Sequence, residues 1–508
     1  MTTSSILLLA ILKIYTVINH YYENSVCYRI FCRLEFLWQT SAIYRFFCIE
    51  DEKQYGGGSH VLALADRLIN PLWVLWSRIT RAFVPFFEGS VASSWVKHSR
   101  VCAFLRLEVL LGLFFFGMAV VHHNFWNNRF IMLAAVFFLA AYVLRHSLVA
   151  DKITAKELCL PLIFYAATAC ISLAVSLDSG DSLRVMVIFL SCLLICQLTP
   201  FIINTRQKFN TALVFLFLGL FATSMFGLFQ YHRGIEVRAA FMDFTMNHLG
   251  VIGRVYSTMD NPNNFAEYII MLLPVFVAFI FNLKSDVKRV AFCILLAPAL
   301  PALILTQSRA SYLCLMAGAV VYVWMIHKRL VPVMAAAVFV SVPLWPPQVM
   351  ARLMTIGRDT SSAFRVMIWN ASLDVLRDIW ATGLGLGPIS FRILYQRYVN
   401  SLAYGAMHSH NLFLQIWIGK GIMGITAFLV LMFVVFKKLV IVCKNTKNFG
   451  DKHFAAGFIA SLTAILGFGM VEYVWFYPRV LLTFWIIVGL ALAHIKICQE
   501  DLCQEERS

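Results

Sequence analysis

Three short polar clusters interrupt an otherwise apolar sequence, and each contains residue types that could do chemistry. The first is centred on Arg254, the second on Arg309, and the third is the run His408-Ser409-His410-Asn411. Arginine presents a permanently charged planar fork that matches phosphate, and histidine can take up a proton at neutral pH. These residue types predict an anion-binding site and an acid–base site.

Structural roles compete with the chemical ones at each cluster. Asn261 and Asn263 lie in an Asn-Pro-Asn-Asn turn that is suited to cap a helix starting near residue 264. Arg309 either extends to the membrane interface or holds an anion at a helix N-terminus. A histidine at a helix boundary is often structural. His408 and His410 do not face one another on a helix, which disfavours a metal site built on helical spacing.

The elements that must position these clusters are membrane-spanning helices. Hydrophobic residues make up 60% of the 508 residues and charged residues 13%, and apolar runs of about 20 residues recur. We predict an all-α, polytopic membrane helix bundle of about twelve transmembrane helices. Nine spans lie in 101–346 and three in 411–496, with a large outer helical loop at 347–410 and a cytoplasmic tail at 497–508. The predicted spans are 101–121, 130–147, 157–177, 184–204, 211–230, 264–283, 289–306, 311–327, 330–346, 411–436, 453–473 and 478–496.

The distribution of lysine orients this bundle. The formal charge of +16 mostly reflects lysines in the short loops of one face, which is therefore expected to be cytoplasmic. This scatter argues against nucleic-acid binding. The other face has no lysine in its loops, and its cations are arginines, which indicates phosphate contacts. They are Arg233, Arg238, Arg254, Arg309, Arg352, Arg358, Arg365, Arg377, Arg392, Arg397 and Arg479.

Two regions flank this pattern. Residues 1–100 mix aromatic and basic residues amphipathically, which predicts a cytoplasmic segment lying in the membrane interface. In the outer loop, residues 364–376 have helical apolar spacing. They precede Gly383, Gly385 and Gly387, which we expect to form a flexible connection between two helices. The loop aromatics, Trp369 among them, either stack on sugar rings or form the core of the loop.

Taken together, these clusters resemble the O-antigen ligase and polymerase family over residues 101–496. The resemblance rests on Asn261-Pro262-Asn263 with Ala266, on Ser308-Arg309-Ala310, on Arg365 with Trp369, and on the glycine run. It ends with His410-Asn411, nine residues, and then Gly421-Ile-Met-Gly424. The order, the spacing and the number of spans agree with the family.

The resemblance implies a glycosyltransferase that moves a glycan from undecaprenyl pyrophosphate to an acceptor hydroxyl, without a metal or other cofactor. Arg254 and Arg309 would bind the donor pyrophosphate, and His410 would deprotonate or orient the acceptor. Further substrate contacts would come from Asn261, Asn263, Arg365, Trp369, His408 and Asn411. The acceptor would be lipid A core or another glycan, at the outer face of the bacterial inner membrane, with both chain termini cytoplasmic and membrane lipids around the bundle.

Some features depart from the family, and other functions compete with the leading one. Asp260 stands where a glycine is common, and Lys420 lies near a position that is often acidic. Lys420 would be buried in its helix and either pair with Glu472 or line a cavity. A surface-polysaccharide polymerase of the same family is an alternative to a ligase. A flippase or a non-catalytic scaffold is less well supported, because the notable charges crowd one face and no internal duplication is visible. The sequence does not specify an oligomeric state.

Overall fold

A computed structural model describes residues 60–88, 106–149, 158–234, 253–354, 360–399 and 402–505, with isolated positions between 23 and 40. The chain divides into two units, Met1–Tyr55 and Gly56–Ser508, and the fold below is that of the second. Its described residues form helices and no strand, so the all-α prediction is confirmed. Most of the predicted interfacial segment lies outside the described residues. Its described part includes α4, His60–Glu88, which packs against α7 through Thr80 and Ser147.

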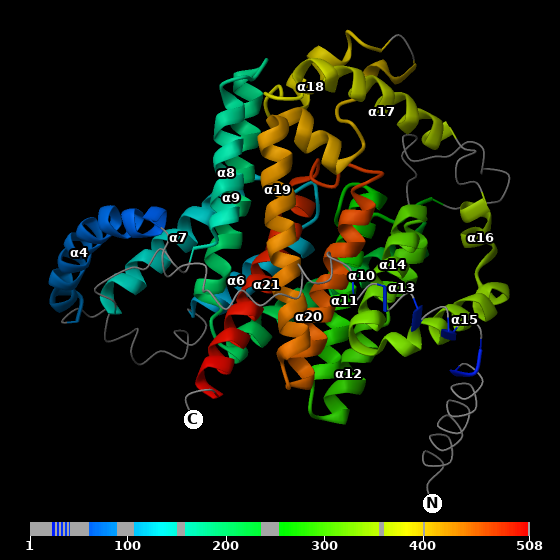
Figure 1. The fold of residues 1–508 in the computed structure, drawn as a ribbon, viewed down its shortest axis with the longest axis horizontal. Coiled ribbons are helices and arrows are strands. Elements are labelled where there is room, and N and C mark those ends of the chain that lie inside the picture. Colours follow the sequence, from blue (N-terminus) through cyan, green and yellow to red (C-terminus); the bar gives the residue numbers. More distant parts are fainter. Residues whose placement is uncertain are drawn as a thin grey trace, which may run out of the picture. The chain divides into compact units, whose positions relative to one another are not determined.

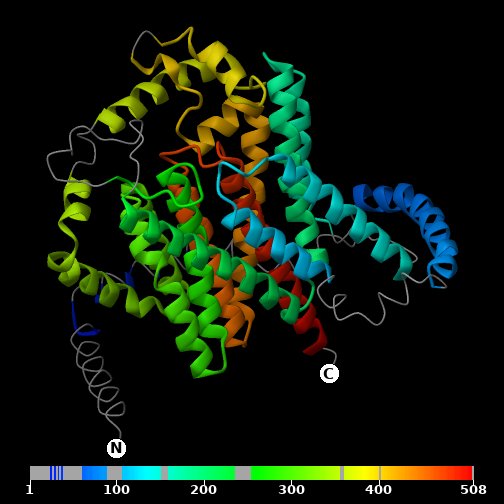
Figure 2. The same cartoon turned by 180° about the vertical axis from the view of Figure 1, so that it is seen from behind.

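The predicted spans coincide with helices. The α-helices after α4 are α6 Leu107–Val120, α7 Arg129–Val149, α8 Leu160–Leu173, α9 Ser179–Ile202, α10 Arg206–Arg233, α11 Pro262–Asn282, α12 Asp286–Leu296, α13 Ala299–Leu305, α14 Arg309–His327, α15 Val331–Ser341, α16 Pro347–Met354, α17 Thr360–Ile379, α18 Pro388–Tyr395, α19 Leu412–Asn445, α20 Phe449–Phe468 and α21 Pro478–Glu505. Figure 1 shows α19, α20 and α21 between the other membrane helices, and Figure 2 shows the same arrangement from behind.

Among the described residues, eight helical stretches are long and apolar enough to cross a membrane, and α6 and α8 are shorter apolar helices. The chain is therefore a polytopic membrane protein. The predicted span at 330–346 does not form one continuous helix. It divides into α15 and two short 3-10 turns, Lys328–Leu330 and Val342–Leu344. Pro343 and Pro346 lie where α15 ends, and proline removes the backbone donor that a longer helix would need.

Close packing against α20 fixes how α11 and α14, two helices that carry the site, are placed along it. A Cβ added to Gly457 in α20 would lie 3.0 Å from the carbonyl oxygen of Pro274 in α11. A Cβ added to Gly318 in α14 would lie 2.8 Å from that of Ala460 in α20. Further along α20, the Ser461 hydroxyl donates to the carbonyl oxygen of Met271 in α11, and a Cβ added to Gly467 would lie 3.6 Å from Cys314 Sγ in α14. Both α11 and α14 therefore run antiparallel to α20. The N-termini of these two helices flank the C-terminus of α20.

The outer loop forms a small helical layer with its own core. Ile368, Val375, Phe391 and Tyr395 are buried there, together with Ile418 of α19. α17 and α18 lie at one end of the bundle (Figures 1 and 2). The loop is therefore packed onto α19 by apolar burial rather than only tethered to it.

A break in α19 provides the backbone contacts for this loop. Gly421 has φ 64° and ψ −168°, which are not helical. The break leaves carbonyl groups free, and the glycine run of the loop uses them. The Leu384 N–H donates to the carbonyl oxygen of Ile418 at 2.9 Å, and the Gly385 N–H donates to that of Gly419 at 3.1 Å. The flexible connection that we expected is instead a docked segment.

The same segment also docks on the turn between α8 and α9. The Ile389 N–H donates to Asp181 Oδ2 at 3.1 Å, and the Ser390 hydroxyl accepts from the Asp178 N–H at 3.1 Å. Gly387 has φ +106°, and a Cβ there would meet Asp181 Oδ2 at 2.5 Å. The glycines are needed because two backbones and a carboxylate approach too closely for any side chain.

Candidate active site

The first two clusters of the sequence meet at Arg254. Its Nε donates to the carbonyl oxygen of Thr306 at 2.8 Å, and its Nη2 donates to Asn263 Oδ1 at 2.7 Å. The Val255 N–H also donates to the carbonyl oxygen of Leu305 at 3.0 Å. The loop before α11 is thus tied to the segment before α14. Asn261 caps α11 by accepting from the Asn263 N–H at 2.8 Å, so both asparagines have structural roles here.

Arg309 is the first residue of α14 and is partly buried. Two residues earlier, Gln307 has a positive φ of 53°. Five residues into α14, the Sγ of Cys314 would lie 3.6 Å from a Cβ added at Gly467, near the end of α20. The first turn of α14 is therefore level with the turn that follows α20. Arg309 therefore lies at the same end of the bundle as the segment that carries Glu472.

The third cluster is organised by Glu472, a residue that the sequence analysis did not place in the site. His410 Nδ1 lies 2.6 Å from Glu472 Oε1, and Arg365 Nη2 lies 3.0 Å from Glu472 Oε2. Trp369 Nε1 donates to the carbonyl oxygen of His410 at 3.2 Å. Arg365, Trp369 and His410, which lie far apart in the sequence, therefore come together. One signal was available: Glu472 is the only acidic residue between Asp451 and Glu500.

This carboxylate determines the state of the imidazole. Because the Nδ1–H of His410 donates a hydrogen bond to Glu472, the other ring nitrogen, Nε2, is left as an acceptor. Burial alone would raise the pKa of Glu472. The charges of His410 and Arg365 and the hydrogen bond from His410 outweigh burial and hold this pKa well below its usual range. The imidazole remains accessible, since its side chain is 30% exposed.

His408 differs from His410 although their ring centroids are 4.1 Å apart. Burial, reinforced by His410, lowers the pKa of His408 to about 3, so it is neutral at physiological pH. Its Nδ1 accepts from the His410 N–H at 3.3 Å. With Glu472 the two histidines offer ligand atoms within 4.8 Å of one another, because they lie in a loop and not on a helix. Arg365 already pairs with that carboxylate, which disfavours a second cation.

Asn411 has a clear structural role. It caps α19 by accepting from the Leu414 N–H at 2.9 Å, and its Nδ2 donates to the carbonyl oxygen of Met470 at 2.8 Å. The Leu412 N–H donates to the carbonyl oxygen of Gly469 at 2.6 Å. The start of α19 is therefore fixed to the end of α20.

Three helix N-termini thus gather around the end of α20: those of α11, α14 and α19. Each presents the positive end of a helix dipole to this region. Arg254, Arg309 and Arg365 lie in or beside these helix starts. This arrangement favours a ligand with more than one negative charge, such as a phosphate or pyrophosphate.

The positions of Lys420 and Arg479 correct two sequence-based interpretations. Lys420 is buried and does not pair with Glu472; its Nζ lies 3.8 Å and 3.7 Å from the ring centroids of Tyr165 and Phe189. A Cβ at Gly424 would meet Lys420 Cβ at 2.1 Å, so both signature glycines, Gly421 and Gly424, serve the break in α19.

Arg479 is fully buried and donates to the carbonyl oxygens of Met118, Val121 and Thr258. The guanidinium of Arg479 therefore links separate segments of the bundle and does not face a phosphate.

The comparison with protein families agrees with this geometry. Residues 291–429 match the family model described as O-antigen ligase. The match includes Arg309, Arg365, His410 and both signature glycines, whereas Arg254 lies before it. The match confirms the resemblance to the O-antigen ligase and polymerase family over residues 291–429. No curated protein matches the chain.

Proposed function

We propose that this membrane protein, which carries an O-antigen ligase domain, transfers a glycan from undecaprenyl pyrophosphate to an acceptor hydroxyl. The acceptor is a lipid A core or the end of another glycan. The observation that carries the proposal is the pairing of His410 with Glu472 next to three converging helix N-termini. A base and an anion site lie together, as a transfer from a pyrophosphate donor requires.

In this reaction His410 Nε2 takes the proton of the acceptor hydroxyl as the hydroxyl oxygen attacks the anomeric carbon. The bond between that carbon and the pyrophosphate oxygen breaks, and polyprenyl pyrophosphate leaves with the electron pair. Glu472 stabilises the imidazolium that forms, and it holds the ring in the productive tautomer. Arg254, Arg309 and the helix N-termini stabilise the negative charge on the leaving group.

We place this site at the outer face of the bacterial inner membrane. The helices α11, α14 and α19 begin at the site and end next to Lys284, Lys328 and Lys444 respectively. Lysine-rich ends favour the cytoplasm. A site at the opposite ends therefore faces the compartment in which lipid-linked glycans are transferred.

The direct test is transfer by the purified full-length protein in detergent. A synthetic undecaprenyl-pyrophosphate oligosaccharide would be the donor, offered with a lipid A core acceptor or with a second lipid-linked glycan. Mass spectrometry would follow both products. Transfer to the lipid acceptor identifies a ligase, and a lengthened glycan identifies a polymerase. No product with either acceptor from a monodisperse, folded sample would contradict the proposal.

Replacing Glu472 by glutamine is expected to slow transfer without weakening donor binding. The amide keeps the shape but removes the charge that stabilises protonated His410. We expect kcat to fall roughly tenfold to hundredfold, less than the loss of general-base catalysis itself, with the donor KM little changed. The matched control is Asp374→Asn, which breaks the ion pair with Arg377 in α17. Equal activity of Glu472→Gln and wild type would remove Glu472 from the mechanism.

A further inference from the structure

A cavity with a polar rim lies at the end of the bundle away from the active site. It has a volume of about 490 Å³, within the range of small-molecule and lipid-headgroup sites. It is bounded by the first residues of α10, α12 and α20 and by the ends of α11 and α21. Neither the proposed reaction nor the family match uses it.

The rim of this cavity is basic. Lys284 and Lys288 line it, and both are exposed. Among the described residues, neither lysine makes an ion pair. Two flexible ammonium groups beside one opening are available to a ligand.

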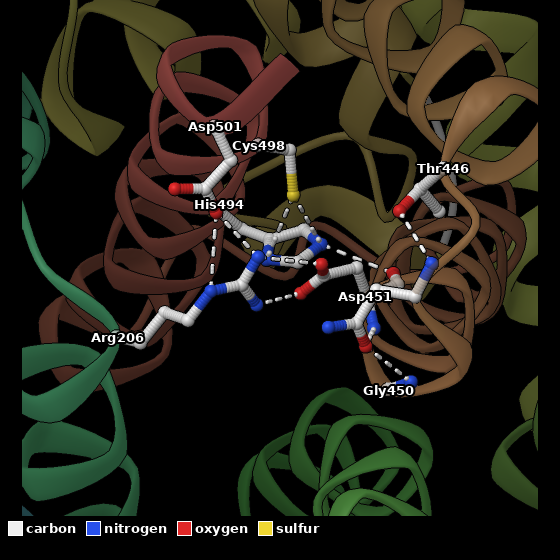
Figure 3. Close-up of polar contacts among 8 residues, drawn as sticks. Arg206, Thr446, Gly450, Asp451, His494, Cys498 and Asp501 are labelled. Carbon is white, nitrogen blue, oxygen red and sulfur yellow. Dashed lines mark hydrogen bonds and ion pairs between the residues drawn. The ribbon is translucent and has the colours of Figure 1, made fainter. Parts of the chain in front are cut away.

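Arg206, Asp451 and His494 line the cavity, and Figure 3 shows the polar contacts that join them to Cys498 and Asp501. Arg206 lies between Asp451 and Asp501; its Nη2 contacts Asp451 Oδ2 at 2.7 Å and its Nε contacts Asp501 Oδ2 at 3.1 Å. His494 Nε2 lies 3.1 Å from the carbonyl oxygen of Asp451, and Cys498 Sγ lies 3.6 Å from the same nitrogen. Asp451, His494 and Cys498 could present ligand atoms to a metal ion, but the guanidinium of Arg206 already neutralises this carboxylate. These groups satisfy one another's hydrogen bonds. One guanidinium faces two carboxylates, and the two lysines at the rim more than offset the negative charge that remains.

Helix starts add to the positive potential of the rim. Ser285 caps α12 and Asn448 caps α20, and both residues line the cavity. Arg206, the first residue of α10, lies there as well. Three helix dipoles therefore direct their positive ends at the opening.

The interior of the cavity is apolar. Phe209, Phe279, Leu283, Phe454 and Ile497 form much of its lining. A small inorganic anion would not be stabilised by contact with these apolar side chains, whereas an acyl chain would be buried against them. A basic rim above an apolar interior, at the end of membrane-spanning helices, complements an amphiphile with a negatively charged head.

We propose that this cavity binds an anionic phospholipid, with its phosphate at Lys284, Lys288 and the helix N-termini and its acyl chain on the phenylalanines. With the lysine-rich end facing the cytoplasm, the lipid comes from the cytoplasmic leaflet, whose anionic headgroups attract basic side chains. The site would anchor the starts of α10, α12 and α20 to one another through the lipid.

The test uses the full-length protein in a zwitterionic detergent with phosphatidylglycerol as the probe. Native mass spectrometry would count retained lipids, and thermal unfolding would report stabilisation. We expect one retained phosphatidylglycerol and a raised Tm, with little effect from phosphatidylcholine or inorganic phosphate. Lys284→Gln combined with Lys288→Gln should weaken binding about thirtyfold, since each lysine contributes roughly a factor of five at an anionic lipid surface.

The control pair is Lys438→Gln with Lys447→Gln. These lysines are also exposed, but neither lines the cavity. This variant should retain the lipid like the wild type, and all variants should have the same Tm without lipid. Equal retention by the Lys284/Lys288 variant would overturn the site. Equal stabilisation by inorganic phosphate would overturn the lipid as its ligand.

Discussion

Replacing His410 is expected to abolish glycan transfer while leaving the protein folded. His410 has φ 48°, a backbone conformation that alanine adopts at a cost but asparagine tolerates. His410→Asn is therefore the sharper substitution, with His410→Ala beside it. Because general-base catalysis contributes roughly 10² to 10⁴ in rate, kcat for transfer should fall by that factor in both variants. Surface glycan in cells and transfer by the purified protein measure the result.

The matched control is His408→Asn. The ring of His408 is neutral and accepts a hydrogen bond from the His410 N–H, whereas the ring of His410 pairs with Glu472. Its replacement should leave most of the activity. If His410→Asn made normal amounts of ligated or elongated glycan at normal protein levels, the proposed role of His410 would be wrong. If His408→Asn lost as much activity as His410→Asn, the base could not be assigned to His410.

Gly421→Ala is expected to detach the outer loop from α19 and to destabilise the protein by about 4 kcal/mol or more. Gly421 has φ +64°, and an added Cβ would lie 2.2 Å from the carbonyl oxygen of Ala381 and 2.7 Å from the carbonyl carbon of Thr382. Both contacts are to backbone, so no side-chain rotation can relieve them. A left-handed conformation adds a further ~1–2 kcal/mol for any residue with a Cβ.

Limited proteolysis of the purified variant would measure this effect, because residues 380–387 should become a cleavage site when they no longer dock. The control is Gly405→Ala in the same outer layer, where an added Cβ meets nothing within 4 Å. It should resist proteolysis like the wild type. Wild-type resistance and wild-type Tm in Gly421→Ala would show that the break in α19 does not hold the loop.

The membrane helices could be predicted because apolar length and loop charge are local properties. Each predicted span overlaps a helix, and Asn261 caps a helix as its position before an apolar run indicated. The span at 330–346 was harder, because its prolines divide an apolar run without changing its composition. Hydropathy reports how apolar a segment is and says little about whether its helix is continuous.

What the sequence could not provide were contacts between distant segments. Glu472 lies 62 residues after His410, and nothing in the spacing shows that they meet. Lys420 packs on the rings of Tyr165 and Phe189, which are far from it in sequence and could not be recognised as its partners. Similarly, the glycine run suggested flexibility because its partners, Ile418 and Asp181, cannot be recognised from the run itself.

The position of the break in α19 connects the outer loop mechanically to the base. Residues 412–420 form a helical segment of roughly 14 Å, at ~1.5 Å per residue, with His410 just before one end and the docked loop at the other. A segment this short behaves as a stiff rod. Because Asn411 and Leu412 are bonded to Met470 and Gly469, this rod joins the docked loop to the same segment that carries Glu472. The loop and both members of the catalytic pair therefore share one rigid support.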